Sequence, residues 1–340
     1  MKVLFNTYPS AFQSIGGGEI QLLKTKEYLE KLGIEVKLFD QWKDKITDYD
    51  IFHSFSTHSE TAKLLEFVKS KGVPIVISTI FWTIGEFAIK DKNIKNSDKM
   101  KIFAKSMIDK YFTKLSPTKS ILEIANILLP NGIAERDKII DVFKIDKKKF
   151  KIIPNGVDKK YANTSPEMFN EKYGLEDFVL SVGAIGPRKN QFNLIRALKG
   201  EDIPIVLIGS TNDKNYLDLC KREGGKNVHI LGFVDEKMLM SAYAACKTFA
   251  LLGWYETPGL TALEAGLAGV NVVITNVGTT KEYFKNYVQY VNFDDIEDVK
   301  EKVVASFNSP KNDKLKKHIL KNFTWEKTAE KTLEAYERVL

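Results

Sequence analysis

Short apolar runs alternate with helix-like segments along the whole chain. The helix-like segments carry apolar residues at every third or fourth position, whereas the runs are rich in Val, Ile, Leu and Phe. Such alternation is typical of parallel sheets covered by helices on both faces. In the first half we expect strands at 3–7, 35–39, 51–54, 74–79, 127–129 and 150–153. In the second half we expect them at 178–182, 205–208, 228–231, 248–251, 270–274 and 290–292.

A turn signal separates the two sets of strands. Pro154-Asn155-Gly156 lies between them, and we place a domain boundary just after it. The length of 340 residues agrees with two domains, because single cores stop growing beyond ~250–300 residues. Glycine (21) and proline (10) are ordinary in number, and no repeat is visible, which excludes disordered, fibrous and solenoid proteins.

The net charge of +7 lies in the first half of the chain. Residues 1–160 hold 28 Lys and Arg against 20 Asp and Glu, whereas residues 161–340 hold 23 against 24. The basic half is expected to face something anionic, unless it only reflects a general excess of lysine. We expect no nucleic acid as the partner, because aromatic residues do not interleave with the basic ones and no helix-turn-helix signal is present.

Part of this charge lies beside an apolar stripe. Met100, Phe103, Met107 and Tyr111 recur at helical spacing among lysines. Segment 95–114 is therefore a candidate for peripheral contact with an anionic membrane, and packing of the stripe on the sheet is the alternative.

The chain lacks signals for export or for spanning a membrane. No secretory leader is expected at the N-terminus, and Gly85 and Glu86 interrupt the longest apolar run. Cys220 and Cys246 show neither disulfide nor zinc spacing. We therefore expect a cytoplasmic protein, either free or peripheral on the inner face of the membrane.

Three glycines follow the first expected strand and open a helix. Gly16-Gly17-Gly18-Glu19 leads into helical periodicity that runs to about Lys31. Glycines let a ligand approach the backbone, and free N–H groups at a helix start attract phosphate. A dinucleotide fingerprint requires glycine where Gln21 stands, which argues against a dehydrogenase. The loop is either a phosphate contact or a flexible turn.

Two cations follow the first strand of the second half. Residues 183–190 read GAIGPRKN, so Arg188 and Lys189 stand at the carboxyl end of that strand. Arginine offers a planar fork and lysine a point charge to a diphosphate. A solvated basic loop is the alternative.

Segment 254–266, WYETPGLTALEAG, pairs two carboxylates with a helix start. We expect Thr257 to cap a helix that begins at Pro258, with free amides at 259–261. Glu264 would then lie ~9 Å along the helix axis, while Glu256 precedes the helix. The two carboxylates could accept hydrogen bonds from hydroxyls of two sugars. The alternative is that both glutamates are surface charges.

In this order, the motifs resemble those of the GT-B glycosyltransferases of family 4, retaining enzymes that use nucleotide-sugar donors. The resemblance runs along nearly the whole chain and includes Pro154-Asn155-Gly156-Val157-Asp158 and Phe323-Thr324-Trp325-Glu326. It implies two Rossmann-like, doubly wound α/β domains that face each other across a cleft. Residues 1–156 would bind the acceptor, together with a C-terminal helix, 323–340, that crosses back. Residues 157–322 would bind the nucleotide sugar.

The resemblance also implies roles for single residues. Glu256 would contact hydroxyls of the transferred sugar, and Lys189 would bind the donor diphosphate. The donor-binding set would comprise Gly17, Gly18, Gly259, Leu260, Thr261 and Glu264, the last on the ribose.

Two positions depart from the family's pattern. Ala184 stands where arginine is usual, so we expect Arg188 to supply that charge as a third catalytic residue. Ile80 stands where histidine is common, which leaves His53 and His58 as the nearby imidazoles. His53 is the candidate for contact with the acceptor or the sugar.

The expected reaction is sugar transfer, with retention, from a UDP- or GDP-linked donor to a glycan, a lipid-linked acceptor or another hydroxyl. The cleft motifs lack DxD metal spacing. Asp48-Tyr49-Asp50 has that spacing but precedes a strand, and Asp294-Asp295, followed by Glu297-Asp298, is expected to cap a helix N-terminus. We therefore expect neither metal nor cofactor, with cations and helix ends stabilising the departing diphosphate. The alternative is a sugar- or nucleotide-binding protein of two domains without catalysis.

Overall fold

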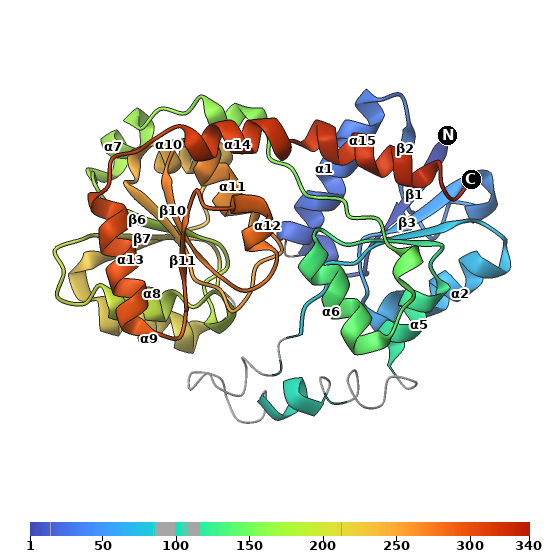
Figure 1. Cartoon of the computed structure of the whole chain (residues 1–340), viewed down its shortest axis with the longest axis horizontal. Helices are drawn as coiled ribbons and strands as arrows, with labels where there is room; N and C mark the ends of the chain where they lie inside the picture. Colours follow the sequence, from blue (N-terminus) through green and yellow to red (C-terminus); the bar gives the residue numbers. More distant parts are fainter. Residues whose placement is uncertain (14, 84, 86–98, 105–106, 108–115, 212) are drawn as a thin grey trace. The chain divides into compact units, whose positions relative to one another are not determined.

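The chain forms two compact α/β units. The computed structural model describes residues 1–13, 15–83, 85, 99–104, 107, 116–211 and 213–340. The described residues up to Gly156 form the first unit together with Trp325–Leu340, and Val157–Thr324 form the second. Figure 1 shows that each unit is a sheet with helices on both faces.

The first unit contains a parallel sheet in the order β2-β1-β3-β4-β5. The strands are β1 (Lys2–Asn6), β2 (Glu35–Leu38), β3 (Ile51–Ser54), β4 (Ile75–Ser78) and β5 (Ile127–Leu129). The helices are α1 (Gly17–Lys31), α2 (Ala62–Ser70), α5 (Pro117–Ile124), α6 (Ile133–Phe143) and α15 (Trp325–Tyr336), with short 3₁₀ helices η1 (Ala11–Gln13), η2 (Ile46–Asp48), η3 (Ser59–Thr61) and η5 (Lys147–Lys149). Helices α1 and α15 pack together, whereas α2, α5 and α6 share one buried cluster with the sheet.

The second unit contains a parallel sheet in the order β11-β10-β9-β6-β7-β8. The strands are β6 (Val179–Val182), β7 (Ile205–Ile208), β8 (Val228–Gly232), β9 (Thr248–Leu251), β10 (Asn271–Thr275) and β11 (Gln289–Val291). The helices are α7 (Glu167–Tyr173), α8 (Gln191–Ala197), α9 (Lys214–Gly224), α10 (Glu236–Ala245), α11 (Leu260–Leu267), α12 (Thr280–Phe284), α13 (Ile296–Asn308) and α14 (Lys314–Asn322), with η6 (Lys159–Ala162), η7 (Pro187–Lys189) and η8 (Gly225–Asn227). Helix α8 packs with α9 and with α13, and α11 packs with α10 and α14.

The two expected parallel sheets are confirmed, and the strands agree with the prediction within one residue at each end except at one place. Residues 150–153 make a single bridge to β5, between Phe150 and Leu128, and no strand. Lys151 and Ile153 donate their N–H groups to the carbonyls of Leu128 and Pro130. The return hydrogen bond would have to come from Pro130, which has no N–H, so the ladder stops there.

Acidic side chains begin several helices of the second unit. Asp213, Asp235 and Asp295 each accept a hydrogen bond from a backbone N–H in the first turn of the helix that follows. The expected helix N-terminus at Asp294-Asp295 is thus confirmed, and Asp295 is the residue that caps it, because its carboxylate accepts from the N–H groups of Glu297 and Asp298.

Helix α15 completes the first unit from the far end of the sequence. Tyr336 is fully buried, and its hydroxyl lies 2.7 Å from Nδ1 of His53 on β3. The hydroxyl of Thr328 donates to the carbonyl of Pro154 over 2.8 Å. The last helix therefore contributes to the core of the unit that begins with β1.

Candidate functional site

The carboxyl ends of β6 and β9 meet where the strand order of the second sheet reverses. From β6 the chain continues to β7 and β8 on one side, and then returns to β9 on the other. Ligands of open parallel sheets bind at such a switch point. The loop after β6 carries Arg188 and Lys189, and the loop after β9 carries Glu256. The topology thus brings together residues that are 67 positions apart.

Several contacts fix these two loops to each other. The N–H of Trp254 donates to the carbonyl of Arg188 over 2.9 Å. The guanidinium of Arg188 lies 5.5 Å from the centre of the Tyr255 ring, within the range of a cation–π contact. Asn190 ends η7 with φ 58, and its side chain donates to the carbonyl of Phe293 over 2.9 Å. The basic loop is therefore an ordered part of the fold.

Lys189 and Glu256 form a nearly buried ion pair at the switch point. Nζ of the lysine lies 2.6 Å from Oε1 of the glutamate, and the two side chains are 15% and 6% exposed. Burial lowers the pKa of Lys189, while the charge of Glu256 acts in the opposite direction. The pair places a cation and a hydrogen-bond acceptor side by side, as binding a phosphate and a sugar hydroxyl requires.

Glycines make room for this ion pair. A Cβ on Gly253 would lie 2.6 Å from Oε1 of Glu256, and one on Gly278 would lie 2.0 Å from its backbone oxygen. Glu256 also donates its N–H to Val277, and its carbonyl accepts from the N–H of Thr279. The backbone of Glu256 is thus fixed by hydrogen bonds through both its N–H and its carbonyl.

The helix after Glu256 begins two residues later than the sequence predicts. Helix α11 starts at Leu260 with Gly259 as its N-cap, so the prediction that Thr257 caps a helix starting at Pro258 is wrong. The bond between those two residues is cis, and Gly259 adopts a left-handed φ of 91°, so all three belong to a turn. Leu260 and Thr261 then supply the first N–H groups of the helix, which have no intrahelical acceptor.

Glu264 lies four residues into α11, which is ~6 Å along the helix axis. Its carboxylate accepts a hydrogen bond of 2.8 Å from the hydroxyl of the buried Tyr243. Burial raises the pKa of Glu264 to about 7, against the lowering effect of that hydrogen bond. A half-buried carboxylate with so perturbed a pKa is a candidate for function.

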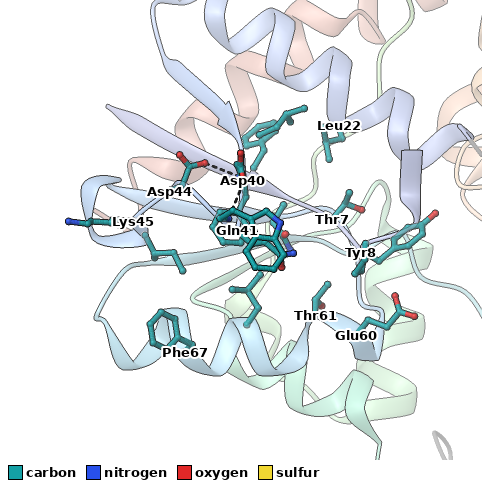
Figure 2. A pocket seen from close by; sticks show the side chains of 18 of the residues that line it. Thr7, Tyr8, Leu22, Asp40, Gln41, Asp44, Lys45, Glu60, Thr61 and Phe67 are labelled. Carbon is teal, nitrogen blue, oxygen red and sulfur yellow. Dashed lines mark hydrogen bonds between the residues drawn. The ribbon is translucent and has the colours of Figure 1, made fainter. Parts of the chain in front are cut away.

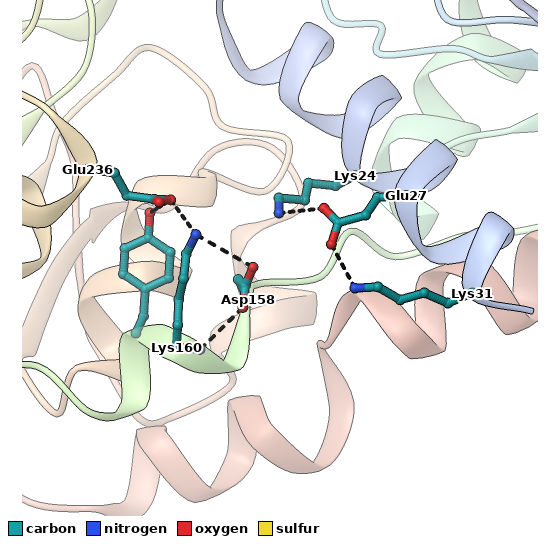
Figure 3. A network of polar contacts seen from close by, with 7 residues as sticks. Lys24, Glu27, Lys31, Asp158, Lys160 and Glu236 are labelled. Atoms are coloured by element: carbon teal, nitrogen blue, oxygen red, sulfur yellow. Dashed lines mark hydrogen bonds and ion pairs between the residues drawn. The ribbon is translucent and has the colours of Figure 1, made fainter. Parts of the chain in front are cut away.

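A polar network joins Asp158 and Lys160 to Glu236 of α10 (Figure 3). Nζ of Lys160 lies 2.6 Å from Oε1 of Glu236 and 3.7 Å from Oδ2 of Asp158. Tyr161 donates to the same oxygen of Glu236 over 3.4 Å, and its ring packs edge-on against the tyrosine that binds Glu264. This network connects the motif at 154–158 to α10 and α11.

A row of glycines lies at the carboxyl edge of β6, β7 and β8, and we did not predict it from the sequence. Gly183 donates its N–H to the carbonyl of Ile208, and Gly209 donates to that of Gly232. A Cβ on Gly209 would lie 2.0 Å from the carbonyl oxygen of Gly183. Phe233 follows directly and is 86% exposed. The dipeptide Gly232-Phe233 at the end of an apolar strand was the signal that could have indicated this edge.

The glycine loop of the sequence analysis lies in the first unit. Gly17 and Gly18 are the first residues of α1, and Gly16 is its N-cap. The carboxylate of Glu19 accepts hydrogen bonds of 2.8 Å from the N–H of Gly16 and from the hydroxyl of Tyr8. The two glycine amides remain in the first turn, where no intrahelical acceptor exists. The loop is thus an ordered helix start rather than a flexible turn.

His53 lies in the core of the first unit. Its Nε2 lies 3.0 Å from the hydroxyl of Ser78, its Nδ1 faces Tyr336, and its ring stacks on Phe55 with centroids 4.1 Å apart. The side chain is fully buried, and burial lowers its pKa to about 3. A ring with no exposed surface and two occupied nitrogens contacts no sugar, which corrects the role expected for His53. The reason is that α15 covers it.

Two further expectations concern metal ions and membranes. Within the residues that the structure describes, no group of three or more His, Cys, Asp or Glu side chains is placed to hold a metal ion. Over the same residues, none of the helices has the length and apolar character needed to cross a membrane. Of segment 95–114 the structure describes residues 99–104 and 107, where Met100 and Phe103 are exposed. The rest of that segment lies outside the described residues.

Comparison with known proteins identifies relatives of this chain. Residues 167–323 match a family model described as glycosyl transferases group 1. The chain is 29% identical to a glycosyltransferase of Methanocaldococcus jannaschii over 223 residues, which is 59% of this chain and 57% of that protein. It is 25% identical to the O-antigen chain mannosyltransferase B of Escherichia coli over 64% of this chain and 61% of that protein. The chain thus spans about three fifths of the length of these relatives.

Solved structures share the fold of the whole chain. Sucrose-phosphate synthase from Thermosynechococcus elongatus has a TM-score of 0.78 at 16% identity, covering 99% of this chain and 98% of that one. Anabaena HepE in complex with UDP and glucose has a TM-score of 0.71 at 17% identity, covering 99% and 100%. These likenesses show the GT-B fold, with two Rossmann-like domains.

Proposed function

Because residues 167–323 match a family model described as glycosyl transferases group 1, we propose that this protein transfers a sugar from a nucleoside-diphosphate sugar to a hydroxyl acceptor with retained anomeric configuration. In this reaction the bond between the anomeric carbon and the phosphate oxygen breaks. A bond to the acceptor oxygen forms, and the acceptor loses its proton. Negative charge grows on the departing diphosphate, so stabilisation of that charge is the main task of the site.

The ion pair of Lys189 and Glu256 carries this proposal. It lies at the switch point of the second sheet, next to Arg188, and it is almost fully removed from solvent. We assign Lys189 and Arg188 to the diphosphate, where fixed cations need little reorganisation during the reaction. Glu256 accepts hydrogen bonds from hydroxyls of the transferred sugar. When a phosphate binds Lys189, the carboxylate is released from the pair and becomes available to those hydroxyls.

The remaining donor contacts come from α11 and from glycine backbones. We assign Glu264 to the ribose hydroxyls, since its carboxylate lies one helical turn beyond the free amides of Leu260 and Thr261. Gly259 allows close approach of the chain before these amides. In the first unit, Gly17 and Gly18 offer two more backbone donors to an anion. We add Phe233 as a platform on which the nucleobase stacks.

The proposal includes metal-independent catalysis, because cations and helix amides supply the charge that a metal would supply. Excess EDTA should then leave turnover unchanged, and a requirement for added Mg²⁺ or Mn²⁺ would overturn this part. Retention is tested by the proton spectrum of the first product formed, before it can mutarotate.

A thermal-shift panel of UDP, GDP, ADP and TDP tests the donor site, because a ligand that binds the native state raises its stability. We expect UDP or GDP to raise the unfolding temperature. The matching nucleotide sugars are then incubated with the protein, and release of the nucleoside diphosphate is followed. The Glu256→Gln variant should keep nucleotide binding and lose turnover. Binding without any release in the wild type, across the sugars tested, would indicate a binding protein and refute the transferase.

Peripheral membrane contact through segment 95–114 is a separate part of the proposal. Wild-type protein should float with vesicles that contain anionic lipid at low salt, and less so at high salt. A joint change of Lys95, Lys99, Lys101 and Lys105 to Glu should abolish flotation. Wild-type protein that stays at the bottom of the gradient would indicate an acceptor in solution.

A further inference from the structure

Acidic side chains in the two units differ in whether a cation neutralises them. In the first unit, Figure 2 shows Asp40 and Asp44 close together in the wall of a cavity. Asp40 lies 3.3 Å from Nζ of Lys43, and Asp44 pairs with Lys37, so both negative charges are balanced within the protein. In the second unit, Glu264 forms no ion pair with a lysine or arginine among the described residues. Its charge therefore depends on other groups.

The hydroxyl of Tyr243 lies beside Glu264 where a cation is absent. It donates to Oε2 of the carboxylate over 2.8 Å, and Oε1 has no hydrogen-bond partner among the described residues. Glu264 is half-buried, whereas Tyr243 has no exposed surface. A carboxylate can accept about four hydrogen bonds. One oxygen is thus held from the interior of the protein, and the other is left for a ligand.

The core fixes the ring of Tyr243 and with it the position of the hydroxyl. Tyr243 belongs to α10 and lies in a large buried cluster of the second unit. Its ring packs edge-on against those of Tyr161 and Phe249, with centroids 6.0 and 5.8 Å apart. Burial raises the pKa of Tyr243 well above its ordinary value, so the hydroxyl keeps its proton and remains a donor. Glu264 therefore meets a rigid hydrogen-bond donor.

The polar groups that face Glu264 come from α10 and η6. Burial and, more weakly, the charge of Glu236 raise the pKa of Glu264 to about 7. The hydrogen bond from Tyr243 and, more weakly, the charge of Lys160 act in the opposite direction. Lys160 and Glu236 lie 2.6 Å apart, so their charges oppose each other, and Tyr161 stays neutral because burial raises its pKa. The Tyr243 hydroxyl is thus the main group that keeps Glu264 ionised.

The remaining elements that pack on α11 add no charged group to these. A Cβ on Gly266 of α11 would lie 2.7 Å from Leu315 and 2.8 Å from Ile319 of α14, so this contact is apolar. Strands β9 and β10 contain no acidic or basic residue. Removal of the Tyr243 hydroxyl is therefore expected to change the charge of Glu264 without breaking an ion pair.

We propose that Tyr243 is a positioning residue of the donor site, because its hydroxyl holds one oxygen of Glu264 and leaves the other, as a charged acceptor, to the ribose hydroxyls. This role rests on the function proposed above, in which Glu264 binds the ribose. Donor affinity should then depend on pH, since hydroxyls bind an ionised acceptor more strongly than a neutral one. With a pKa of about 7, the ionised fraction of Glu264 rises from about a tenth at pH 6 to about nine tenths at pH 8, so affinity should rise up to about tenfold.

The Tyr243→Phe variant keeps the ring and removes the hydroxyl. The pKa of Glu264 should then rise, which should move the increase in affinity upwards by about one pH unit and weaken binding at pH 7 about fivefold. Calorimetric titrations with UDP and with GDP from pH 6 to 9 measure this. Each affinity is divided by that of Glu264→Gln at the same pH, because the titrations of the nucleotide and of other side chains then cancel.

The matched control is Tyr216→Phe, which also removes a buried hydroxyl from the second unit. That hydroxyl accepts from the N–H of Phe192 over 2.9 Å. The control variant should keep the wild-type dependence of affinity on pH, even if it is less stable.

The charge of Glu264 is also measured without nucleotide. Carbon NMR of protein labelled at the glutamate carboxyl carbons follows its titration, and Glu264→Gln assigns the signal by its loss. The midpoint should be higher in Tyr243→Phe than in the wild type, and unchanged in Tyr216→Phe.

Two kinds of failure are distinguishable. Equal carbon midpoints in the wild type and in Tyr243→Phe, or a loss of affinity that is the same at every pH, would overturn the role of Tyr243, since a merely structural tyrosine gives these results. The same nucleotide affinity, or none, in the wild type and in Glu264→Gln at every pH would instead refute the assignment of Glu264 to the ribose, and this role with it.

Discussion

Replacing Glu264 with Gln should stabilise the second unit and weaken nucleotide binding at the same time. The substitution keeps an oxygen that can accept the 2.8 Å hydrogen bond of Tyr243, and it removes the charge that burial disfavours. A desolvated carboxylate that lowers stability is retained where the function needs its charge. If Glu264 binds the donor, one variant should therefore show both effects, higher stability and weaker nucleotide binding.

The size of the gain in stability follows from the pKa of Glu264. Burial raises it from 4.5 to about 7, which corresponds to about 3 kcal/mol at ~1.4 kcal/mol per unit. Below pH 4.5 both the folded and the unfolded carboxyl carry a proton, so no penalty exists. As the pH rises towards 7, the unfolded chain releases its proton while the folded chain keeps it, which favours unfolding. Above pH 7 the full penalty of about 3 kcal/mol acts on the wild type only.

Urea unfolding at a series of pH values from 4.5 to 8.5 measures this difference. Trp254 reports on the second unit if the other three tryptophans are changed to Phe in both proteins. The free energy of unfolding of Glu264→Gln minus that of the wild type should increase by about 3 kcal/mol across the series, because all other titrations cancel. At pH 8 the variant should bind the nucleoside diphosphate at least tenfold more weakly, since hydrogen bonds to a charged acceptor contribute ~1.5–3 kcal/mol. A difference that does not vary with pH, or unchanged nucleotide affinity, would refute the reasoning.

Three further predictions concern the glycines, the cations and the buried imidazole. Gly253→Ala should abolish turnover, because its Cβ would meet a carboxylate oxygen of the ion pair at 2.6 Å, whereas Gly186→Ala, with nothing within 4 Å, should be close to wild type in a nucleotide-release assay. Arg188→Ala should weaken nucleotide binding about tenfold, and adding Ala184→Arg should restore part of it in calorimetry; no rescue in a folded double variant would show that position 184 cannot reach the diphosphate. Because burial lowers the pKa of His53 from 6.5 to about 3, the first unit should lose up to about 5 kcal/mol as the pH falls from 6.5 to 3, and His53→Phe should remove most of this dependence in urea unfolding.

The periodicity of the chain was enough to predict both sheets and nearly every strand. Buried parallel strands read as continuous apolar runs, and this pattern can be seen without knowing which strands pair. The prediction of a strand at 150–153 was wrong, because a strand forms only where its neighbour can exchange hydrogen bonds with it. Pro130 has no N–H to return, and a run of apolar residues carries no information about its partner.

In the candidate site, too, the sequence indicates single residues but not which of them lie in contact. Arg188, Lys189 and Glu256 could be named because each follows a strand or stands in a recognisable motif. Their contact required the strand order, which places β6 next to β9 and which no local pattern determines. The role expected for His53 was wrong for a related reason. The helix that covers this residue lies 283 positions away along the chain.

The return of α15 to the first unit has a consequence for synthesis on the ribosome. Val157–Thr324 form the second unit from one continuous stretch, whereas the first unit needs residues from 325 onwards, which are made after that stretch. Nascent domains fold as their residues emerge. Folding of the first unit therefore stays incomplete, with the face of β3 around His53 uncovered, until the second unit and α15 have been translated. A chaperone that holds nascent chains is expected to bind this waiting face, and to be released once Tyr336 closes over it.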